Sequence, residues 1–219
     1  SRCRQGPGLW TGESGGIGWN PQGDHIAVSY KEEESNRYDL LALRLEGDDQ
    51  SDLKGIETFE LAARPGFMEW TPSFSRDGRW VAYASDETGQ MQVYVQAFPE
   101  GTGRKRISEL DLPSNFPVWS KNSNELLFNS RTAMGQSQIY TTQYEIVDGS
   151  FKHHSPVPWN GAIRDGQGNG PDSGFDIDPE GKRLLVKKWL NQEVIPTRDH
   201  IILIENFFDV LREKAPANH

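Results

Sequence analysis

The sequence predicts an all-β fold, and three observations support that prediction. Short runs rich in aromatic and β-branched residues alternate with turn-forming residues along the chain, a pattern typical of β-strands. The chain of 219 residues contains 22 Gly, 13 Pro and 7 Trp, which suits many tight turns and large side chains packed between sheets. A strand–turn–strand unit at residues 71–86 also recurs along the chain, which indicates a repeated architecture.

The turn at the centre of this unit contains Asp77 and Gly78. Gly78 can adopt a positive φ without steric cost, and the Asp77 side chain can bond to nearby backbone, so the pair favours a tight reversal. Equivalent turns begin at Asn20, Ser75, Ser120 and Asp178. Their spacing of 45 to 58 residues fits the blade of a β-propeller, which needs roughly 40 to 50 residues plus loop insertions.

Each copy is expected to supply up to four antiparallel strands, the innermost of which precedes the turn. Second strands are expected at residues 25–30, 80–84, 126–129 and 184–187, and third strands at 38–45, 92–98, 138–142 and 200–204. More polar fourth strands are expected at residues 58–61, 104–108 and 150–153. Polar residues suit an outer strand because they discourage pairing with other chains.

The expected blades cover residues 16–65, 66–110, 111–160 and 161–205. Residues 1–15 form an N-terminal segment that could belong to a preceding blade. The last copy lacks a polar fourth strand, and residues 206–214 instead predict a short helix that Asn206 can cap, within a tail at 206–219. We therefore expect about four blades here, as part of a six-bladed ring in a longer protein.

Composition limits the classes of partner and cofactor. The net charge of -9 argues against nucleic acid, because binding to phosphates needs clustered Lys and Arg. Cys3 is the only cysteine, so neither an internal disulfide nor a cluster of thiolate ligands can form. No run approaches the roughly 18 apolar residues of a membrane span. We expect no cofactor, no nucleic acid and no membrane span in this segment.

The repeat also resembles a known family. Residues 74–83 (FSRDGRWVAY) resemble the repeat core of TolB-type, WD-repeat-like β-propellers. Residues 85–99 (SDETGQMQVYVQAFP) and 204–212 (IENFFDVLR) are similar to segments of the C-terminal sensor propeller of bacterial Ser/Thr protein kinases. The resemblance implies a ligand- or protein-binding module in the extracytoplasmic part of a membrane-anchored signalling protein. The chain itself contains no kinase motif, so kinase activity cannot be assigned to it, and we expect this chain alone not to be an enzyme.

The candidate ligand-binding residues come from loops that lead into innermost strands. Such loops lie near the mouth of the central channel, where propellers commonly bind their ligands. The loop at 164–174 is the longest of them. The candidates are Trp70, Asn115, Phe116, Arg164, Asp165 and Asp172.

Two other motifs are weaker. Asp165, Asn169 and Asp176 stand at positions one, five and twelve of a segment that resembles a calcium loop, but Gln167 and the missing final Glu leave little negative charge. We therefore predict no metal there. Residues 12–16 match G-x-S-x-G, yet no apolar strand precedes them and no helix follows, which favours a Gly-rich loop over a nucleophile elbow.

The sequence thus predicts a non-catalytic propeller that binds a protein or a small molecule at its channel mouth and serves a bacterial signalling protein. Two alternatives stay open. One is a TolB-like periplasmic scaffold that binds proteins. The other is an accessory propeller that controls access to a serine peptidase or other hydrolase.

Overall fold

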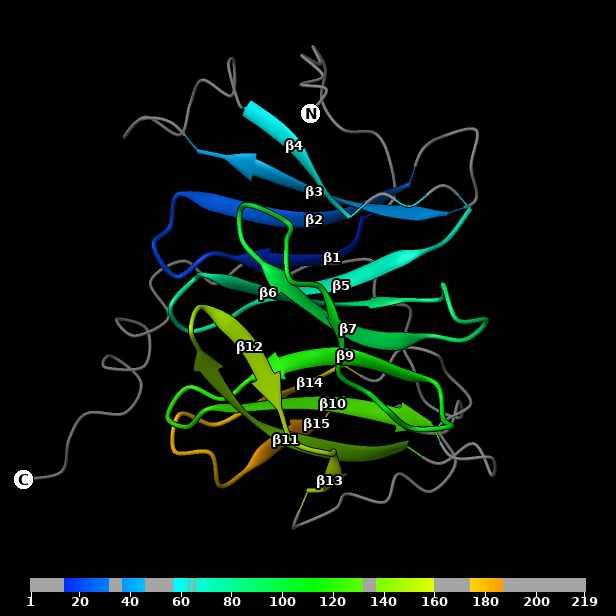
Figure 1. The fold of residues 1–219 in the computed structure, drawn as a ribbon, viewed down its shortest axis with the longest axis vertical. Helices are drawn as coiled ribbons and strands as arrows, with labels where there is room; N and C mark the ends of the chain where they lie inside the picture. Colours follow the sequence, from blue (N-terminus) through cyan, green and yellow to red (C-terminus); the bar gives the residue numbers. More distant parts are fainter. Residues whose placement is uncertain are drawn as a thin grey trace, which may run out of the picture. The chain divides into compact units, whose positions relative to one another are not determined.

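The computed structural model describes residues 14–31, 37–45, 57–62, 64, 66–131, 137–159 and 174–186. All of them belong to one compact unit, Ser1–Lys188. The described residues form fifteen β-strands and no helix (Figure 1). Within these ranges, therefore, there is no helix that is long and apolar enough to cross a membrane.

Within each described blade, the first strands pair antiparallel in chain order, which is the arrangement of a propeller blade. The first blade contains β1 (Ser14–Trp19), β2 (His25–Lys31), β3 (Tyr38–Arg44) and β4 (Glu57–Ala62). The second contains β5 (Glu69–Phe74), β6 (Trp80–Ser85), β7 (Gln92–Ala97) and β8 (Lys105–Arg106). The third contains β9 (Ser114–Trp119), β10 (Glu125–Arg131), β11 (Ser137–Val147) and β12 (Ser150–His153). The fourth is described through β14 (Phe175–Ile177) and β15 (Leu184–Val186).

The described strands confirm the all-β blade architecture, with one difference in the third blade. There, β11 continues to Val147, and β12 pairs with that extension at residues 144–147. A further short strand, β13 (Val157–Pro158), takes the expected place of a fourth strand beside Tyr140 and Thr141. The strand expected at 200–204 and the helix expected at 206–214 lie outside the described residues.

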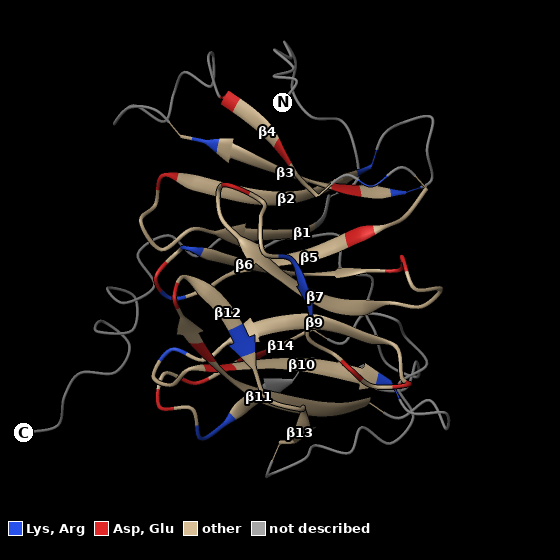
Figure 2. Ribbon diagram, viewed as in Figure 1, with Lys and Arg blue, Asp and Glu red and all other residues tan. Residues whose placement is uncertain are grey.

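Apolar residues hold neighbouring blades together. Phe74 and Phe98 of the second blade make an edge-to-face contact at 4.8 Å and pack on Ala27 and Leu40 of the first. Between the second and third blades, Phe151 lies 5.3 Å from the ring of Trp80. Each such buried side chain contributes roughly 1.5–3 kcal/mol to stability. Figure 2 shows charged residues mainly at turns and strand ends, and β6, β7 and β9 carry none.

Consecutive blades are also joined through their first turns. The Gln22 side chain donates a hydrogen bond of 2.9 Å to the backbone oxygen of Asp77. Arg76 in turn donates to the backbone oxygen of Lys121 at 3.1 Å. Asn122 donates to that of Glu180 at 2.5 Å. The repeated turn therefore serves two purposes, since it reverses the chain and contacts the next blade.

Candidate binding groove on the channel side

The innermost strands of all four blades line one groove with a volume of about 280 Å³. β1 lies beside β5, β5 beside β9, and β9 beside β14 (Figure 1). We call this the channel-side groove, and its lining is mostly apolar. The residues that line it are Gly16, Ile17, Thr71, Pro72, Ser73, Phe116, Pro117, Val118 and Phe175.

The backbone bends in the same way in two of these strands. Thr71 and Phe116 have φ values of 52° and 54°, in the left-handed region that residues with a side chain rarely adopt. Each precedes a proline and lies at a point where the strand has one residue more than its partner. A backbone held this way costs about 1–3 kcal/mol per residue and is found preferentially at binding and active sites.

Asn115 joins the two bent strands. Its Oδ1 atom accepts a hydrogen bond of 2.9 Å from the Thr71 hydroxyl of the neighbouring blade. The same oxygen accepts a second bond of 2.8 Å from the backbone N–H of Phe116. One amide thus stabilises the left-handed residue in its own strand and fixes the spacing between β5 and β9.

Three aromatic rings from three blades lie in a row at the rim of the groove. The ring of Trp70 stacks on that of Tyr38 at 5.7 Å with an angle of 7° between the planes. Its other neighbour is Phe116, 6.3 Å away and tilted by 50°. The Trp70 side chain is half-buried, and its Nε1 atom is buried with no acceptor among the described residues. The row gives the rim a broad aromatic surface.

Three of the six predicted ligand residues therefore come together here. Phe116 lines the groove, while Trp70 and Asn115 lie at its rim and contact the residues that line it. Arg164, Asp165 and Asp172 lie outside the described residues, as does Asn169 of the calcium-like loop. Asp176 is in β14, where its Oδ1 accepts a hydrogen bond of 2.8 Å from the backbone N–H of Ile177.

Sequence reasoning missed Tyr38, Thr71 and Phe175. The Thr–Pro pair at 71–72 and the Phe–Pro pair at 116–117 occupy the same place in the repeat, so an alignment of the copies could have drawn attention to Thr71. Tyr38 could not be found that way, because it reaches the groove rim from a third strand of another blade.

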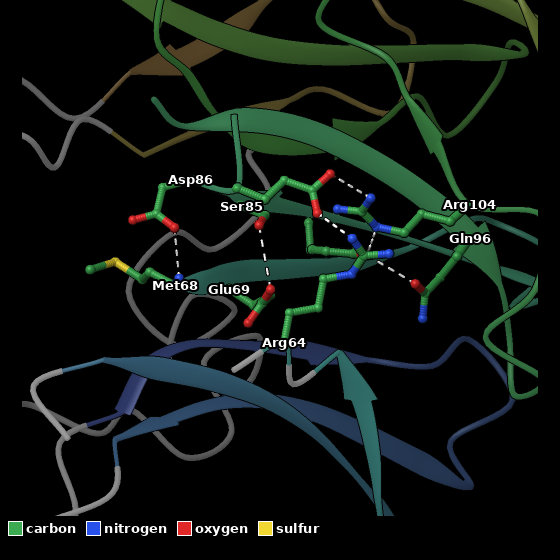
Figure 3. A network of polar contacts seen from close by, with 9 residues as sticks. Arg64, Met68, Glu69, Ser85, Asp86, Gln96 and Arg104 are labelled. Carbon is green, nitrogen blue, oxygen red and sulfur yellow. Dashed lines mark hydrogen bonds and ion pairs between the residues drawn. The ribbon is translucent and has the colours of Figure 1, made fainter. Parts of the chain in front are cut away.

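A partly buried polar network lies around Glu69 of the second blade (Figure 3). Arg104 pairs with Glu87 at 2.6 Å, donates to the Tyr83 hydroxyl at 2.7 Å and lies 3.7 Å from the centre of the Tyr94 ring. The other oxygen of Glu87 pairs with Arg64 at 2.6 Å. Burial opposes ionisation of Glu87, but the hydrogen bond and charge of Arg104 hold its pKa below the usual value.

Glu69 is the exceptional residue of this network. It is fully buried, its Oε1 atom is 3.4 Å from the Ser85 hydroxyl, and its Oε2 atom has no partner among the described residues. Burial, reinforced by the negative charge of Asp39, raises the pKa of Glu69 to about 7 against a lowering backbone hydrogen bond from Arg64. An ionisable group therefore lies directly before Trp70 in β5.

The described residues do not assemble a metal centre. Within them, no three His, Cys, Asp or Glu side chains are close enough to hold an ion. Ser14 of the G-x-S-x-G motif begins β1 and pairs with Tyr30, so it stands in a strand ladder rather than on a strand-to-helix turn.

Solved structures with the same fold are known. No model of a protein family and no curated protein matches the chain. A TolB-type protein from Agrobacterium tumefaciens aligns with a TM-score of 0.50 and 20% identity over 70% of this chain and 52% of its own. TolB from Acinetobacter baumannii aligns with 0.51 and 18% over 83% of this chain and 39% of its own. A chain of the nidogen/laminin complex aligns with 0.50 and 14% over 80% and 56%.

These likenesses agree with the meander sheets and define the class of the molecule, which is a β-propeller protein. The chain spans about half the length, or less, of the solved structures that it resembles. Because these identities are 20% or below, the likeness shows a shared fold alone.

Proposed function

We propose that this chain is a non-catalytic propeller module that binds a segment of a protein partner in the channel-side groove. The observation that carries the proposal is the shared strain at Thr71 and Phe116, which the Asn115 amide holds in place on two adjacent blades. Strained backbone of this kind persists where the surrounding structure enforces it. In this chain, the strained residue Phe116 lines the groove.

The chemistry of the groove suits a peptide better than a charged metabolite. Its walls are aromatic, aliphatic and proline side chains, and none of its lining residues is charged. Large aromatic residues around a concave apolar centre commonly dominate the energy of protein recognition. Trp70 and Phe116 are therefore the residues that we expect to supply most of the affinity.

The finer assignment is a sensor or scaffold within a bacterial signalling protein, C-terminal to a Ser/Thr kinase domain. It is supported by the resemblance of residues 85–99 and 204–212 to kinase-associated propellers. A second candidate is a TolB-like periplasmic scaffold, which the two TolB structures favour. The nidogen/laminin structure is itself a complex between proteins, which is compatible with either role.

The two candidates predict different domains ahead of residue 1 in the full-length protein. A kinase Gly-rich loop and H-R-D motif followed by a membrane span before residue 1 would support the first. A secretion signal followed by an α/β domain would support the second. The sequence encoded upstream of Ser1 is thus the observation that decides between them.

The binding proposal can be tested with a displayed library of random peptides, selected on purified residues 1–219. Hydrogen exchange of the complex with a selected peptide should show slower exchange in β5 and β9. Slower exchange confined to other strands would overturn the groove assignment. The non-catalytic claim fails if the purified chain hydrolyses an ester, peptide or glycoside substrate and Asn115→Ala abolishes that activity.

A further inference from the structure

The same position ends the innermost strand in every blade, but its exposure differs in one copy. Phe74, Trp119 and Ile177 are 8%, 5% and 2% exposed. Trp19 occupies this position in the first blade and is 59% exposed. The residue type is equally apolar in all four copies, so the difference lies in what covers it.

In the three buried copies the cover is the preceding blade. Phe74 packs with Ala27 and Ala42 of the first blade. Trp119 packs with Ala82 and Val95 of the second blade. Ile177 packs with Leu127 and Ile139 of the third blade. Each time, the covering residues are small or medium aliphatic side chains on the second and third strands of the blade before.

The first blade presents an apolar face with the same design. Ile17 is 61% exposed, and it pairs across the ladder with Val28 as Trp19 does with Ile26. Directly opposite residues in neighbouring strands point to the same side of a sheet, so these four side chains share one face, which Leu41 and Leu43 extend from β3. Leu41 is buried, so the face is open mainly at Ile17 and Trp19. We call it the open face, consisting of Ile17, Trp19, Ile26, Val28 and Leu43. An exposed apolar surface of this kind marks an interaction site.

The first turn of this blade shows a matching polar feature. In the next blade, the backbone oxygen of Asp77 accepts its hydrogen bond from a side chain on the turn before it. The equivalent atom of the first blade is the backbone oxygen of Gln22, which is exposed and receives no hydrogen bond from the described residues. A blade that covered the open face would place a donor there.

We propose that the open face is the docking surface of a further four-stranded β-blade that is not part of residues 1–219. The partner blade presents Ala, Val and Leu from its second and third strands to Trp19 and Ile17. It carries Asn, Gln or Arg on its first turn to reach the Gln22 carbonyl. This inference rests on the repeat, and Ile17 is the residue that the open face shares with the lining of the groove.

Hydroxyl-radical footprinting of the purified chain provides the first test. We expect rapid oxidation of Trp19 and slow oxidation of its buried equivalent Trp119. Slow oxidation of Trp19 in the monomer would overturn the proposal, because another segment of this chain would then cover the face. Slow oxidation that develops only as protein concentration rises would also overturn it, in favour of a second copy.

The second test supplies a blade of the stated kind. Ser14 and Ser114 occupy equivalent positions in the first and third blades, and residues 64–113 naturally precede Ser114. A duplicate of residues 64–113 can therefore be fused directly ahead of residues 14–219. We expect the oxidation rate of Trp19 to fall to that of Trp119. A matched fusion whose added copy carries Ala82→Glu should leave Trp19 reactive. Equal rapid oxidation of Trp19 in both fusions would overturn the proposal.

Discussion

The side-chain amide of Gln22 donates a 2.9 Å hydrogen bond to the backbone oxygen of Asp77, 55 residues further along the chain. The two residues occupy the same turn in successive blades. Their contact explains why an acidic or amide residue followed by glycine recurs there without forming a catalytic site. The turn is a joint between blades, and the two bonds that follow it, from Arg76 and from Asn122, extend the series.

Substitution of the turn glycines should separate backbone strain from the contact between blades. Gly23 and Gly78 have φ values of 79° and 68°, but a methyl group at Gly23 meets open space, whereas one at Gly78 overlaps the Gln22 amide. We expect Gly23→Ala to cost about 1 kcal/mol and Gly78→Ala about 1 kcal/mol more. Urea unfolding measures both.

The control for this pair is the double variant Gln22→Ala with Gly78→Ala. Without the Gln22 amide, the added methyl group loses its shortest contact and meets only Asn20 Nδ2, at 2.9 Å. The extra cost of Gly78→Ala should therefore fall in the Gln22→Ala background. Equal costs at the two glycines in the wild-type background would mean that the turn makes no energetic contact with the next blade.

The equivalent tryptophans Trp19 and Trp119 should respond very differently to truncation. Trp119 is 5% exposed and its Nε1 donates to the backbone oxygen of Ser73 at 3.0 Å, so Trp119→Ala should destabilise the chain by about 3–5 kcal/mol. Trp19 is 59% exposed, so Trp19→Ala should cost less than about 1 kcal/mol. Thermal unfolding of the two variants checks this, and similar losses would show that Trp19 is covered in the isolated chain.

Glu69 should make stability fall as pH rises. Its pKa is about 7 in the folded state and 4.5 ordinarily, so between these values the folded chain binds more protons than the unfolded one. The free energy of unfolding should therefore decrease between pH 4.5 and 7 by a total of about 3 kcal/mol and then level off. Glu69→Gln should remove most of this slope and be more stable than wild type at pH 8.

Glu87 supplies a control of opposite sign. Its pKa is lowered in the folded state, so its ionised form stabilises the chain above the ordinary pKa and that stabilisation is lost as pH falls. Glu87→Gln should thus weaken the protein at pH 8, where Glu69→Gln strengthens it. Urea unfolding at pH 5 and pH 8 compares the two, and a weakened Glu69→Gln variant at pH 8 would contradict the account of its burial.

Arg104 should not be replaceable by lysine. Its guanidinium contacts Glu87, the Tyr83 hydroxyl and the Tyr94 ring at once, which a single ammonium group cannot reproduce. We expect Arg104→Lys to cost about 2 kcal/mol. The exposed neighbour Arg106 is the matched control, and Arg106→Lys should change stability by less than about 0.5 kcal/mol. Equal effects of the two in chemical unfolding would contradict a structural role for the network.

Much of the fold could be predicted because the repeat marks it. The turn glycines and the apolar strands after them recur at regular intervals, and local chemistry was enough to place them. The pairing of β12 with an extension of β11 was not predictable, because it depends on Phe151 packing between two blades. Burial of Glu69 was not predictable either, since nothing in the local sequence marks this position as fully buried.

The groove was predictable only in part. Trp70, Asn115 and Phe116 were found because they precede or begin innermost strands. The left-handed backbone of Thr71 runs against the preference of a β-branched residue, and the Thr71 hydroxyl bonds to Asn115 of another blade. Such a contact between distant residues leaves no local pattern in the sequence.

The most direct test of the central claim is the affinity of a library-selected peptide for Phe116→Ala, measured by isothermal titration calorimetry. Val157→Ala is the control, because Val157 is 55% exposed on β13, away from the residues that line the groove. The account predicts a loss of about tenfold or more for Phe116→Ala and no loss for Val157→Ala. Undiminished affinity of the Phe116 variant would contradict it.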